Sequence, residues 1–497
     1  MEQDIQCWTP VLACLVSLLA VIPIIGFGEK RKNLREASTL IAGAIMFGLV
    51  CSMISPIMAG RNIYARLVGI APGLELAFRV DQLGLLFALL ASFLWIVTSV
   101  YSIGYMRGLK EHAQTRYYSF FAVALSATMG VAFSANLLTL YVFYELLSLS
   151  TWPLVTHHQD KEARGGGRKY LTYLLGTSVG FLLPAMIFCY VKSGGNGMVF
   201  ADNGFIGTFV TSKETALILL LLFVFGFSKS GLMPFHSWLP CAMVAPTPVS
   251  ALLHAVAVVK VGVFCIFRLF TGVFGIEFLK SMDLGTVICW IAAFTIIVSS
   301  LIALSQDNLK RRLAFSTIGQ LAYITLGVAL LSPQGITGSA VHIIMHAFGK
   351  ITLFFCAGAI FEATGRKNIS EMVGIGKQMP VTMIAFFIGS LSVIGLPLAG
   401  GFWSKFYLVW GTITAHQYAM MVVLLVSSLL NAAYFFPIVF KGFFCKPEES
   451  LFGDKIKEAH PAAVLALSTT ALATILLFIF PGPVFSIARL ATAYFIS

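Results

Sequence analysis

Charged side chains are scarce in this sequence. They make up 11% of its 497 residues, whereas hydrophobic residues make up 58% and the mean hydropathy is +0.89. A soluble domain usually carries about a quarter charged residues, so this composition excludes an ordinary soluble fold and indicates a polytopic membrane protein. Because no long linker or low-complexity stretch interrupts the apolar pattern, we expect one transmembrane domain, 1–497, in the lipid bilayer.

Motifs that hold cofactors, metals or nucleotides are also lacking. The nine cysteines are scattered, without a Cys-x-x-Cys pair, a Cys/His cluster or a haem-attachment motif, and are expected to be buried thiols. No glycine-rich phosphate loop and no Ser/His/Asp set is evident. We therefore expect no cofactor, no metal, and no redox or hydrolytic site in the chain itself, which leaves open a place in a redox-driven translocase.

Long apolar runs predict an all-α fold. The run 11–27 lacks the basic start of a cleavable signal peptide, and further spans follow it, so it is expected to be a first helix. Runs of about 18–25 apolar residues predict membrane-spanning helices. There are fourteen such spans: 9–27, 38–58, 82–106, 117–134, 136–156, 170–191, 215–234, 247–270, 284–304, 313–332, 338–361, 381–410, 418–440 and 462–480.

The positive charges gather on one side of this predicted bundle. Loops after the odd-numbered spans hold 21 Lys and Arg residues, and the opposite loops with the C-terminal tail hold 8, counting Arg268 at the end of the eighth span. The positive-inside rule places the richer loops in the cytoplasm and both termini outside it, in a plasma (inner) membrane. The net charge of +12 thus needs no nucleic-acid partner. Four cations remain within the spans, namely Lys229, Lys260, Lys350 and Lys405.

Two predicted spans contain helix breakers close to these lysines. The seventh ends in Gly231-Leu232-Met233-Pro234, and the twelfth contains the glycine- and proline-rich stretch 395–401. Proline removes a backbone donor and glycine loosens a helix, so both helices should be discontinuous. In transporters, such breaks mark the transport path near mid-membrane. Their spacing of five helices suggests two related five-helix units, and the alternative is a simple proline kink in each packed helix.

One carboxylate lies deep in a span. A lysine at the bilayer centre costs roughly 3 kcal/mol or more, so it is expected where it is paired, hydrated or functional. An ion pair between Glu145 and one of the lysines would lower the desolvation cost of both, and its making and breaking would switch the proton affinity of that lysine. A static pair that fixes helix packing is the alternative. Asp81, at the mouth of the third span, suits an interfacial or a capping role.

The eleventh span carries a polar stripe. His342, His346 and Lys350 follow one another at four-residue spacing and share one helix face. Two histidines at this spacing can bind a metal, but no third ligand is near in sequence, and a hydrated proton-carrying stripe fits better because histidine titrates near neutral pH. In the eighth span, His254 and Lys260 lie about 120° apart around the helix, so they border only a wide cavity. A row of such residues across many helices predicts a proton pathway: Glu145, Lys229, His254, Lys260, His342, His346, Lys350 and Lys405.

Four stretches resemble motifs of a known family: SKSGLMPFHSWLPCAMVAPTPVSALLHAVAVVKVGVF, YELLSLSTWPLV, HIIMHAFGKITLFFCAGAI and GLPLAGGFWSKFYL. They are similar to the antiporter-like subunits shared by Mrp-type multisubunit cation/proton antiporters, respiratory complex I and membrane-bound energy-converting hydrogenases. The resemblance covers nearly the whole chain and implies two inverted five-helix repeats, helices 4–8 (116–270) and 9–13 (284–440). Cys241 stands where relatives often have an acidic residue, so no loop ion pair is expected there. The short tail after the last span resembles the D-type subunit.

The same resemblance assigns roles to the intramembrane residues. It implies that Glu145 and Lys229 form a switching pair, and that the terminal position of the second half-channel is Lys405. The central hydrophilic axis would contain His254, Lys260 and Lys350.

The predicted function is therefore proton transfer through two half-channels by one of several integral membrane subunits. The first interpretation is a subunit of a monovalent cation (Na⁺ or K⁺)/H⁺ antiporter. The alternative is a proton- or sodium-pumping subunit of a redox-driven complex, because both assemblies use the same module. The missing cofactor motifs disfavour a redox enzyme in its own right, and four intramembrane lysines disfavour a purely structural scaffold.

Overall fold

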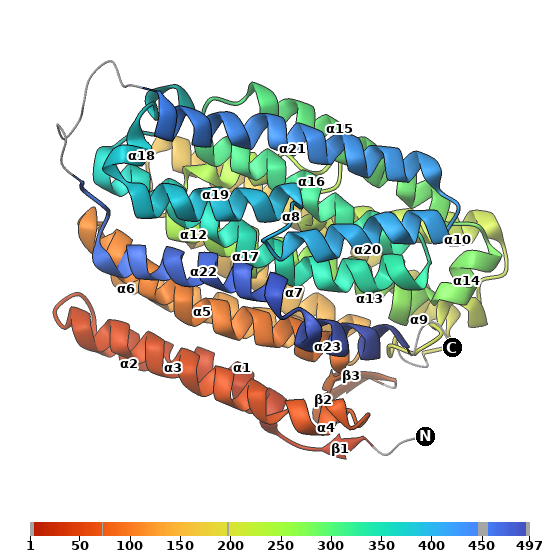
Figure 1. Cartoon of the computed structure of the whole chain (residues 1–497). Helices are drawn as coiled ribbons and strands as arrows, with labels where there is room; N and C mark the ends of the chain where they lie inside the picture. Colours follow the sequence, from red (N-terminus) through yellow and green to blue (C-terminus); the bar gives the residue numbers. More distant parts are fainter. Residues whose placement is uncertain (1–3, 72, 196–197, 446–455, 494–497) are drawn as a thin grey trace.

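The computed structural model describes residues 4–71, 73–195, 198–445 and 456–493. Long helices lie roughly parallel in one bundle, with a small sheet at one end (Figure 1). Helices cover all fourteen predicted spans. Within the described residues, ten helical segments are long and apolar enough to cross a membrane by themselves. The chain is thus a multi-pass helical membrane protein, as the composition predicts.

The N-terminal half contains the first seven predicted spans. Its helices are α1 (Thr9–Leu19), α2 (Val21–Phe27), α3 (Lys32–Ser52), α4 (Ile54–Met58), α5 (Gln82–Gly108), α6 (Gln114–Ala132), α7 (Leu137–Val155), α8 (Lys161–Thr177), η1 (Ser178–Leu182), α9 (Leu183–Lys192), η2 (Ile206–Thr208), α10 (Lys213–Gly226) and η3 (Ser228–Ser230).

The C-terminal half contains the other seven, and a helix after them that the sequence pattern does not predict, α23. Its helices are α11 (Trp238–Cys241), η4 (Ala242–Val244), α12 (Thr247–Ala251), η5 (Leu252–Val256), α13 (Val258–Arg268), η6 (Leu269–Phe274), α14 (Ile276–Ser281), α15 (Gly285–Ser305), α16 (Leu309–Ala329), α17 (Pro333–Thr364), η7 (Ile369–Glu371), α18 (Ile375–Gln378), α19 (Pro380–Ile394), α20 (Gly401–Thr414), α21 (Tyr418–Phe444), α22 (Pro461–Ile479) and α23 (Gly482–Ala493).

A small sheet, made of one strand before α1 and a hairpin between α4 and α5, is also absent from the sequence expectations. It contains β1 (Ile5–Gln6), β2 (Ile63–Ala71) and β3 (Leu74–Val80), in the order β1-β2-β3. β1 pairs with β2 in parallel, and β2 pairs with β3 as an antiparallel hairpin. Its residues alternate in burial only weakly, and so the strands leave little period-2 signal in an apolar sequence.

Asp81 fixes the start of α5. Its carboxylate Oδ1 accepts a hydrogen bond of 2.8 Å from the Gly84 amide, which confirms the capping role considered for it. Arg268, from the end of α13, donates to both oxygens of the same carboxylate, at 2.8 Å for Oδ1. Although burial raises the pKa of Asp81, the guanidinium and the amide hold it below its ordinary value.

The seventh and twelfth spans are discontinuous, as predicted. The helix of the seventh span, α10, ends at Gly226, and the short turn η3 follows it. This break precedes Gly231, the first residue of the predicted breaker, because η3 lies against α13 at Gly262, where a Cβ would overlap the backbone of η3. In the twelfth span, α19 ends at Gly395, which has a φ of +90° that favours glycine, and α20 begins at Gly401.

Two further spans contain π-helical turns that their sequences do not announce. The turn η1 interrupts the sixth span, and η5 interrupts the eighth span around His254. π-turns inside α-helices are rare and are frequent at functional sites.

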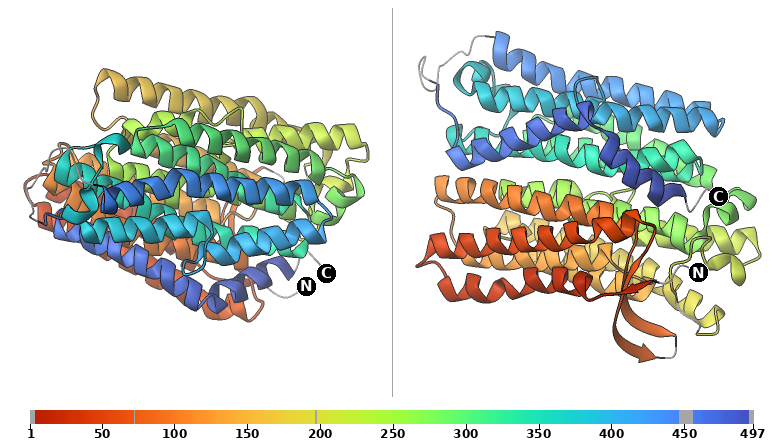
Figure 2. Two further views of the ribbon diagram at one scale, coloured as in Figure 1. Left: turned by 45° about the horizontal axis from the view of Figure 1, so that its top comes forward. Right: turned by 60° about the horizontal axis from the view of Figure 1, so that its bottom comes forward.

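The core of the bundle surrounds α17. This helix packs against α16, α19, α20 and α22, and it is buried along almost its whole length, as is the segment from α12 to η6. The first helices and α21 lie at opposite edges (Figure 1 and the right-hand view of Figure 2). Their outer faces expose large apolar side chains such as Ile22 and Leu429, as expected for helices in contact with lipid.

Candidate functional site

The predicted polar residues lie in the interior of the bundle. Glu145 is on α7, Lys229 on η3, His254 on η5, Lys260 on α13, the stripe of two histidines and Lys350 on α17, and Lys405 on α20. Except for the partly buried Glu145, all of them are buried. Burial of this many ionisable groups in one bundle is costly and is typical of a transport path.

Lys229 contacts the helix that carries Glu145. Its Nζ donates to the Tyr144 carbonyl oxygen at 2.9 Å and to Ser148 Oγ at 2.6 Å, and it lies 3.1 Å from the centre of the Tyr144 ring. Both Glu145 oxygens are buried and accept no hydrogen bond from the described residues. Among those residues no ion pair within 4.0 Å joins Glu145 to Lys229. The two groups are neighbours held apart, and their pairing stays a prediction.

The short turn η3 is held by three neighbouring segments. The Thr177 hydroxyl donates to Ser228 Oγ at 2.6 Å, and the Trp238 indole donates to the Ser228 carbonyl oxygen at 3.1 Å. On the third side, a Cβ at Gly262 would overlap the peptide between Lys229 and the next residue. The lysine therefore stands on a backbone with little freedom to shift, while its side chain has partners within one turn of α7.

Lys260 and the α17 histidines form a row in which two hydrogen bonds are joined by one ring stack. Lys260 Nζ lies 2.6 Å from His346 Nδ1. The rings of His346 and His342 are stacked at 5.6 Å between centroids, and His342 Nδ1 lies 2.8 Å from Ser404 Oγ. The stripe predicted from the four-residue spacing thus faces α13 on one side and α20 on the other.

The side chain of Lys405, from α20, reaches the break in the twelfth span. Its Nζ donates to the Ile394 carbonyl oxygen at 3.1 Å and to Ser428 Oγ at 3.2 Å, and it lies 4.6 Å from the Tyr323 ring centre. The break supplies the first acceptor, because helix breakers release a carbonyl from the backbone ladder. Lys405 follows Ser404, so it adjoins the end of the histidine row.

Lys350 leads to a different set of hydroxyl groups. Its Nζ donates to Ser316 Oγ at 2.7 Å, and Ser316 also accepts from the Tyr434 hydroxyl at 2.9 Å. Tyr434 contacts Asn431 as well. These partners, like Ser148 and Ser404, were missed by sequence reasoning, because single hydroxyls in apolar helices are usually packing residues.

His254 is the member that the structure leaves apart. Its ring is fully buried and lies 4.7 Å from the Phe354 ring, and neither ring nitrogen hydrogen-bonds to a described residue. This agrees with the angular separation from Lys260 expected on the eighth helix.

A cavity of about 780 Å³ extends from the surface to Thr247, at the start of the helical segment that contains His254. Glu162 and Lys367 line it on the outside, and Thr247 lines it in the interior. Thr247 lies seven residues before His254 on the same helical segment. Lys310 also lines the cavity and donates to the Ala245 carbonyl oxygen at 2.6 Å, so one cation of the basic loop cluster points inward rather than into solvent.

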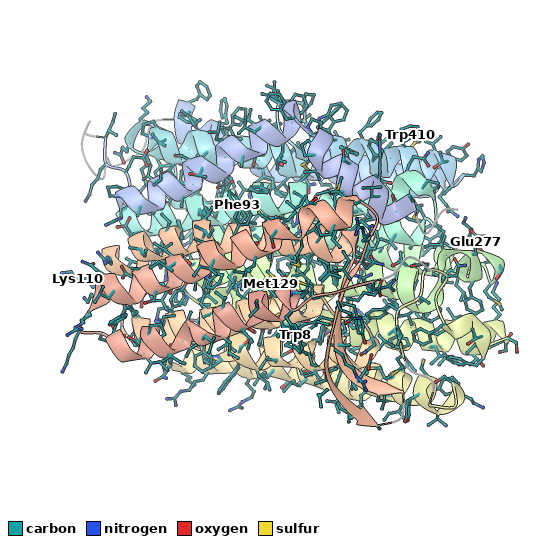
Figure 3. All side chains as sticks on the ribbon, turned by 90° about the horizontal axis from the view of Figure 1, so that it is seen from below. Trp8, Phe93, Lys110, Met129, Glu277 and Trp410 are labelled. Atoms are coloured by element: carbon teal, nitrogen blue, oxygen red, sulfur yellow. The ribbon has the colours of Figure 1, made fainter. Side chains whose placement is uncertain are left out.

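The cavity opens at the end of the bundle where the Lys/Arg-rich loops gather. Figure 3 places Lys110, from one of these loops, and Glu277, from a loop of the opposite set, at opposite ends of the molecule. A smaller cavity of about 380 Å³, lined by Lys280, Asp283 and Gln417, lies in loops of that second set.

Family models match most of this chain. The model described as "NADH:quinone oxidoreductase/Mrp antiporter, TM" matches residues 134–431, and the model described as "NADH-Ubiquinone oxidoreductase (complex I), chain 5 N-terminus" matches residues 71–121. All eight predicted pathway residues fall within the first match.

Curated relatives belong to two kinds of complex. NADH-quinone oxidoreductase subunit N of Desulforudis audaxviator is 35% identical, over 74% of this chain and 72% of that one. A Na(+)/H(+) antiporter subunit of Alkalihalophilus pseudofirmus is 33% identical, over 78% of this chain and 50% of that one. The chain therefore corresponds to about half of that antiporter protein.

Solved structures share the fold. A chain of the Mrp complex from Dietzia sp. DQ12-45-1b aligns with a TM-score of 0.83 and 19% identity, over 97% of both chains. A chain of the membrane-bound sulfane sulfur reductase, an archaeal respiratory membrane complex, aligns with a TM-score of 0.86 and 22% identity, over 99% of this chain and 98% of that one.

Proposed function

The chain belongs to the family of NADH:quinone oxidoreductase and Mrp antiporter membrane subunits, and we propose that it moves protons across the membrane along its buried lysine and histidine row. In this proposal it is one of several integral membrane subunits, most simply of a Na⁺/H⁺ antiporter. The alternative host is a redox-driven complex, which the 35% identity to an oxidoreductase subunit favours. In either host complex the chain would carry out the same proton transfer.

The observation that carries the proposal is the row from Lys260 through His346 and His342 to Ser404. Its two hydrogen bonds, of 2.6 and 2.8 Å, are within the distance over which protons pass between heavy atoms. Lysine and histidine can each hold or release a proton. The row joins α13 to α20, and hence the eighth span to the twelfth.

Protons would enter through the 780 Å³ cavity, which is lined by Thr247 two helical turns before His254. They would leave past Lys405, beside the break in the twelfth span. The two ends of the path then lie in different five-helix units, 116–270 and 284–440, which we infer to be inverted repeats with one broken helix each.

The switch in this proposal is the contact between Lys229 and Glu145. Lys229 now hydrogen-bonds to residues on either side of Glu145 on α7. A change of side-chain rotamer, without backbone movement, would bring Nζ to the carboxylate. The pair would then hold the proton on the lysine when closed and release it when open.

We infer that another integral membrane subunit covers α7. Glu145 shares one face of this helix with Val142, Leu149 and Trp152, which are 40%, 53% and 41% exposed. Glu145 is only partly buried although both of its oxygens are covered. A charge this near to lipid is costly, and so a protein neighbour is the better cover. The proposed setting is a plasma (inner) membrane, with the Lys/Arg-rich loops in the cytoplasm and both termini outside.

Flux measurements test the proposal. The purified assembly is reconstituted in proteoliposomes that enclose a pH-sensitive dye. The internal pH should change on a Na⁺ pulse if antiporter subunits copurify, and on electron input if redox subunits copurify. Lys260→Met should lower the flux at least 10-fold, because methionine fills a similar volume without a titratable group. Lys213→Met, at an exposed helix start, is the matched control. Equal flux in Lys260→Met and wild type would refute the pathway.

A further inference from the structure

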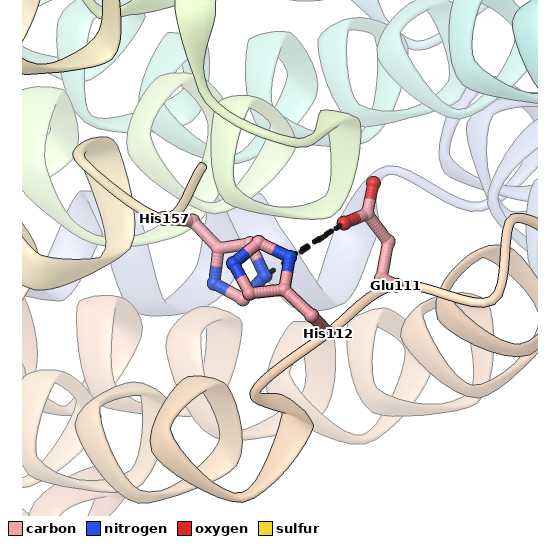
Figure 4. A group of neighbouring side chains, drawn as sticks. All are labelled: Glu111, His112 and His157. Carbon is pink, nitrogen blue, oxygen red and sulfur yellow. Dashed lines mark ion pairs between the residues drawn. The ribbon is translucent and has the colours of Figure 1, made fainter. Parts of the chain in front are cut away.

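Three histidines and one carboxylate meet where two loops approach each other at the cavity end of the bundle. The loop between α5 and α6 carries Glu111 and His112, and the loop after α7 carries His157 (Figure 4) and His158. Glu111 Oε2 lies 3.7 Å from His112 Nδ1, 3.9 Å from His157 Nε2 and 3.8 Å from His158 Nδ1. None of these residues is among the eight predicted pathway residues.

His157 is the fixed member of this cluster. Its side chain is fully buried, and neither ring nitrogen has a hydrogen-bond partner among the described residues. Arg116 secures the loop by donating to the His157 carbonyl oxygen at 2.7 Å. Buried ring nitrogens are almost always bonded, and the 3.9 Å to Glu111 is too long for a hydrogen bond.

Ion pairs between protonated histidines and Glu111 do not explain why these three rings lie together. The fully buried His157 ring has no hydrogen-bond partner among the described residues, so one of its nitrogens is available to bind a cation. The His112 ring lies 4.8 Å from that of His157 and 6.2 Å from that of His158. Protonated rings this close would repel one another, whereas neutral rings can share one cation.

The spacing suits a small divalent metal. Zinc binds imidazole nitrogen and carboxylate oxygen at about 2.0–2.2 Å in a tetrahedron, which sets its ligand atoms about 3.3 Å apart. The ligand atoms of Glu111, His112 and His157 all lie within 4.8 Å of one another. His158 lies outside this set, with its Nδ1 3.8 Å from Glu111 Oε2. His112 is exposed and His158 is partly exposed, so both side chains can move closer, by about 1.5 Å where the atoms are furthest apart.

We propose that Glu111, His112, His157 and His158 form a binding site for a zinc-type divalent cation. Three nitrogen ligands and one oxygen favour Zn²⁺ or its neighbours Co²⁺, Ni²⁺ and Cu²⁺ over the oxygen-seeking Mg²⁺ and Ca²⁺. The sequence expectation of no metal weighed only residues near one another in the chain, and these two pairs are 45 residues apart.

The site lies on the wall of the 780 Å³ cavity, because Glu111 and His158 both line it. A bound dication there would remove Glu111 as a proton acceptor and add positive charge beside the entrance. It would therefore slow proton uptake. This effect on transport rests on the proposed function, whereas metal binding does not.

Binding is measured first, on the full-length chain purified with its copurifying subunits. Titration with ZnCl₂ by calorimetry, and with CoCl₂ by visible absorption, should show a site that His112→Ala or Glu111→Gln weakens at least 10-fold. His416→Ala, which removes another exposed histidine, should match wild type. Identical titrations of wild type and both cluster variants overturn the site, and so does the absence of binding in all of them.

Flux is measured second, in proteoliposomes. ZnCl₂ should inhibit wild-type flux, and His112→Ala should need at least 10-fold more metal while its flux without metal is unchanged. Wild-type flux that is indifferent to saturating ZnCl₂ overturns the inhibitory role. A wild type that binds cobalt but moves no protons supports the metal site and refutes the proposed function, so the two failures are distinct.

Discussion

At the scale of single residues, Lys229 contacts the helical turn of α7 that carries Glu145 without forming an ion pair with it among the described contacts. Lys229 hydrogen-bonds to Tyr144 and Ser148, which bracket Glu145 on α7. The ammonium has three N–H donors, and the carbonyl and the hydroxyl use two of them, which leaves one for the carboxylate. Two alternative partner sets on one helix are what a two-position switch requires.

We expect Lys229→Ala and Glu145→Ala each to abolish proton flux nearly completely, with assembly intact, because each removes one half of the switch. If the pair acts as a unit, the double variant should be no slower than either single variant, since effects of coupled groups do not add. Ser148→Ala, which removes one of two open-state partners, should give an intermediate rate. The test is dye-monitored flux with subunit stoichiometry checked on gels. Wild-type rates in both single variants would sink the switch.

At the scale of elements, the broken helices depend on close approaches as much as on breakers. The turn η3 can carry Lys229 at that depth only because α13 presents Gly262 to it. We expect Gly262→Ala to lower flux as strongly as Lys229→Ala and to destabilise the protein by roughly 1–3 kcal/mol, the usual range for overpacking. Thermal unfolding in detergent measures the second effect. Gly176→Ala, at a helical glycine with open space around it, should be neutral or slightly stabilising.

The start of α5 offers a test of pH dependence. Asn caps helices as well as Asp does, so Asp81→Asn keeps the cap and removes only the ion pair with Arg268. We expect the free energy of unfolding to fall by about 2 kcal/mol, which is typical of a lost hydrogen bond to a charged group. The native pKa of Asp81 lies below its ordinary value, so the stabilisation is fully present above the unfolded pKa and disappears as pH falls through the native one.

The measurement is the melting temperature of wild type and Asp81→Asn from pH 8 down to the acid limit of the detergent. The difference between the two should be constant from about pH 5 to 8 and should shrink only below about pH 4, where the free carboxyl titrates. Asp81→Ala should be the least stable, because it also loses the cap. A difference that grows toward acid would contradict the ion pair.

Elements differ in how far sequence could predict them. The fourteen spans and both broken helices follow from apolar runs, proline and glycine, which act locally. The π-turn at His254 and the hairpin β2–β3 do not, because their residues satisfy the ordinary helical or apolar pattern and tertiary contacts decide. The lysines could be found as the cations left over within spans. Their hydroxyl partners, Ser148 and Ser428 among them, could not, since one serine in an apolar helix carries no signal.

At the scale of the whole molecule, the proposed path requires a defined orientation. The large cavity must face the cytoplasm if the Lys/Arg-rich loops do, and β1 must then lie on the other side, because it stands at the opposite end of the bundle (Figure 1). Two thiols report on these ends. Cys241 lines the cavity, and Cys7 follows β1 with its Sγ 3.0 Å from the Thr9 hydroxyl. Both are partly exposed.

We expect a membrane-impermeant maleimide to label Cys241 only in inside-out vesicles and Cys7 only in right-side-out vesicles. Each would be tested as the single cysteine of an otherwise cysteine-free chain, with mass shift as the readout. Hydrogen bonds to Thr9 lower the pKa of Cys7, which increases its thiolate fraction and its reactivity. Labelling of both thiols from one side would mean that the chain crosses the membrane differently. The reverse pattern would keep the fold but turn the cavity, with the histidine cluster at its wall, toward the outside.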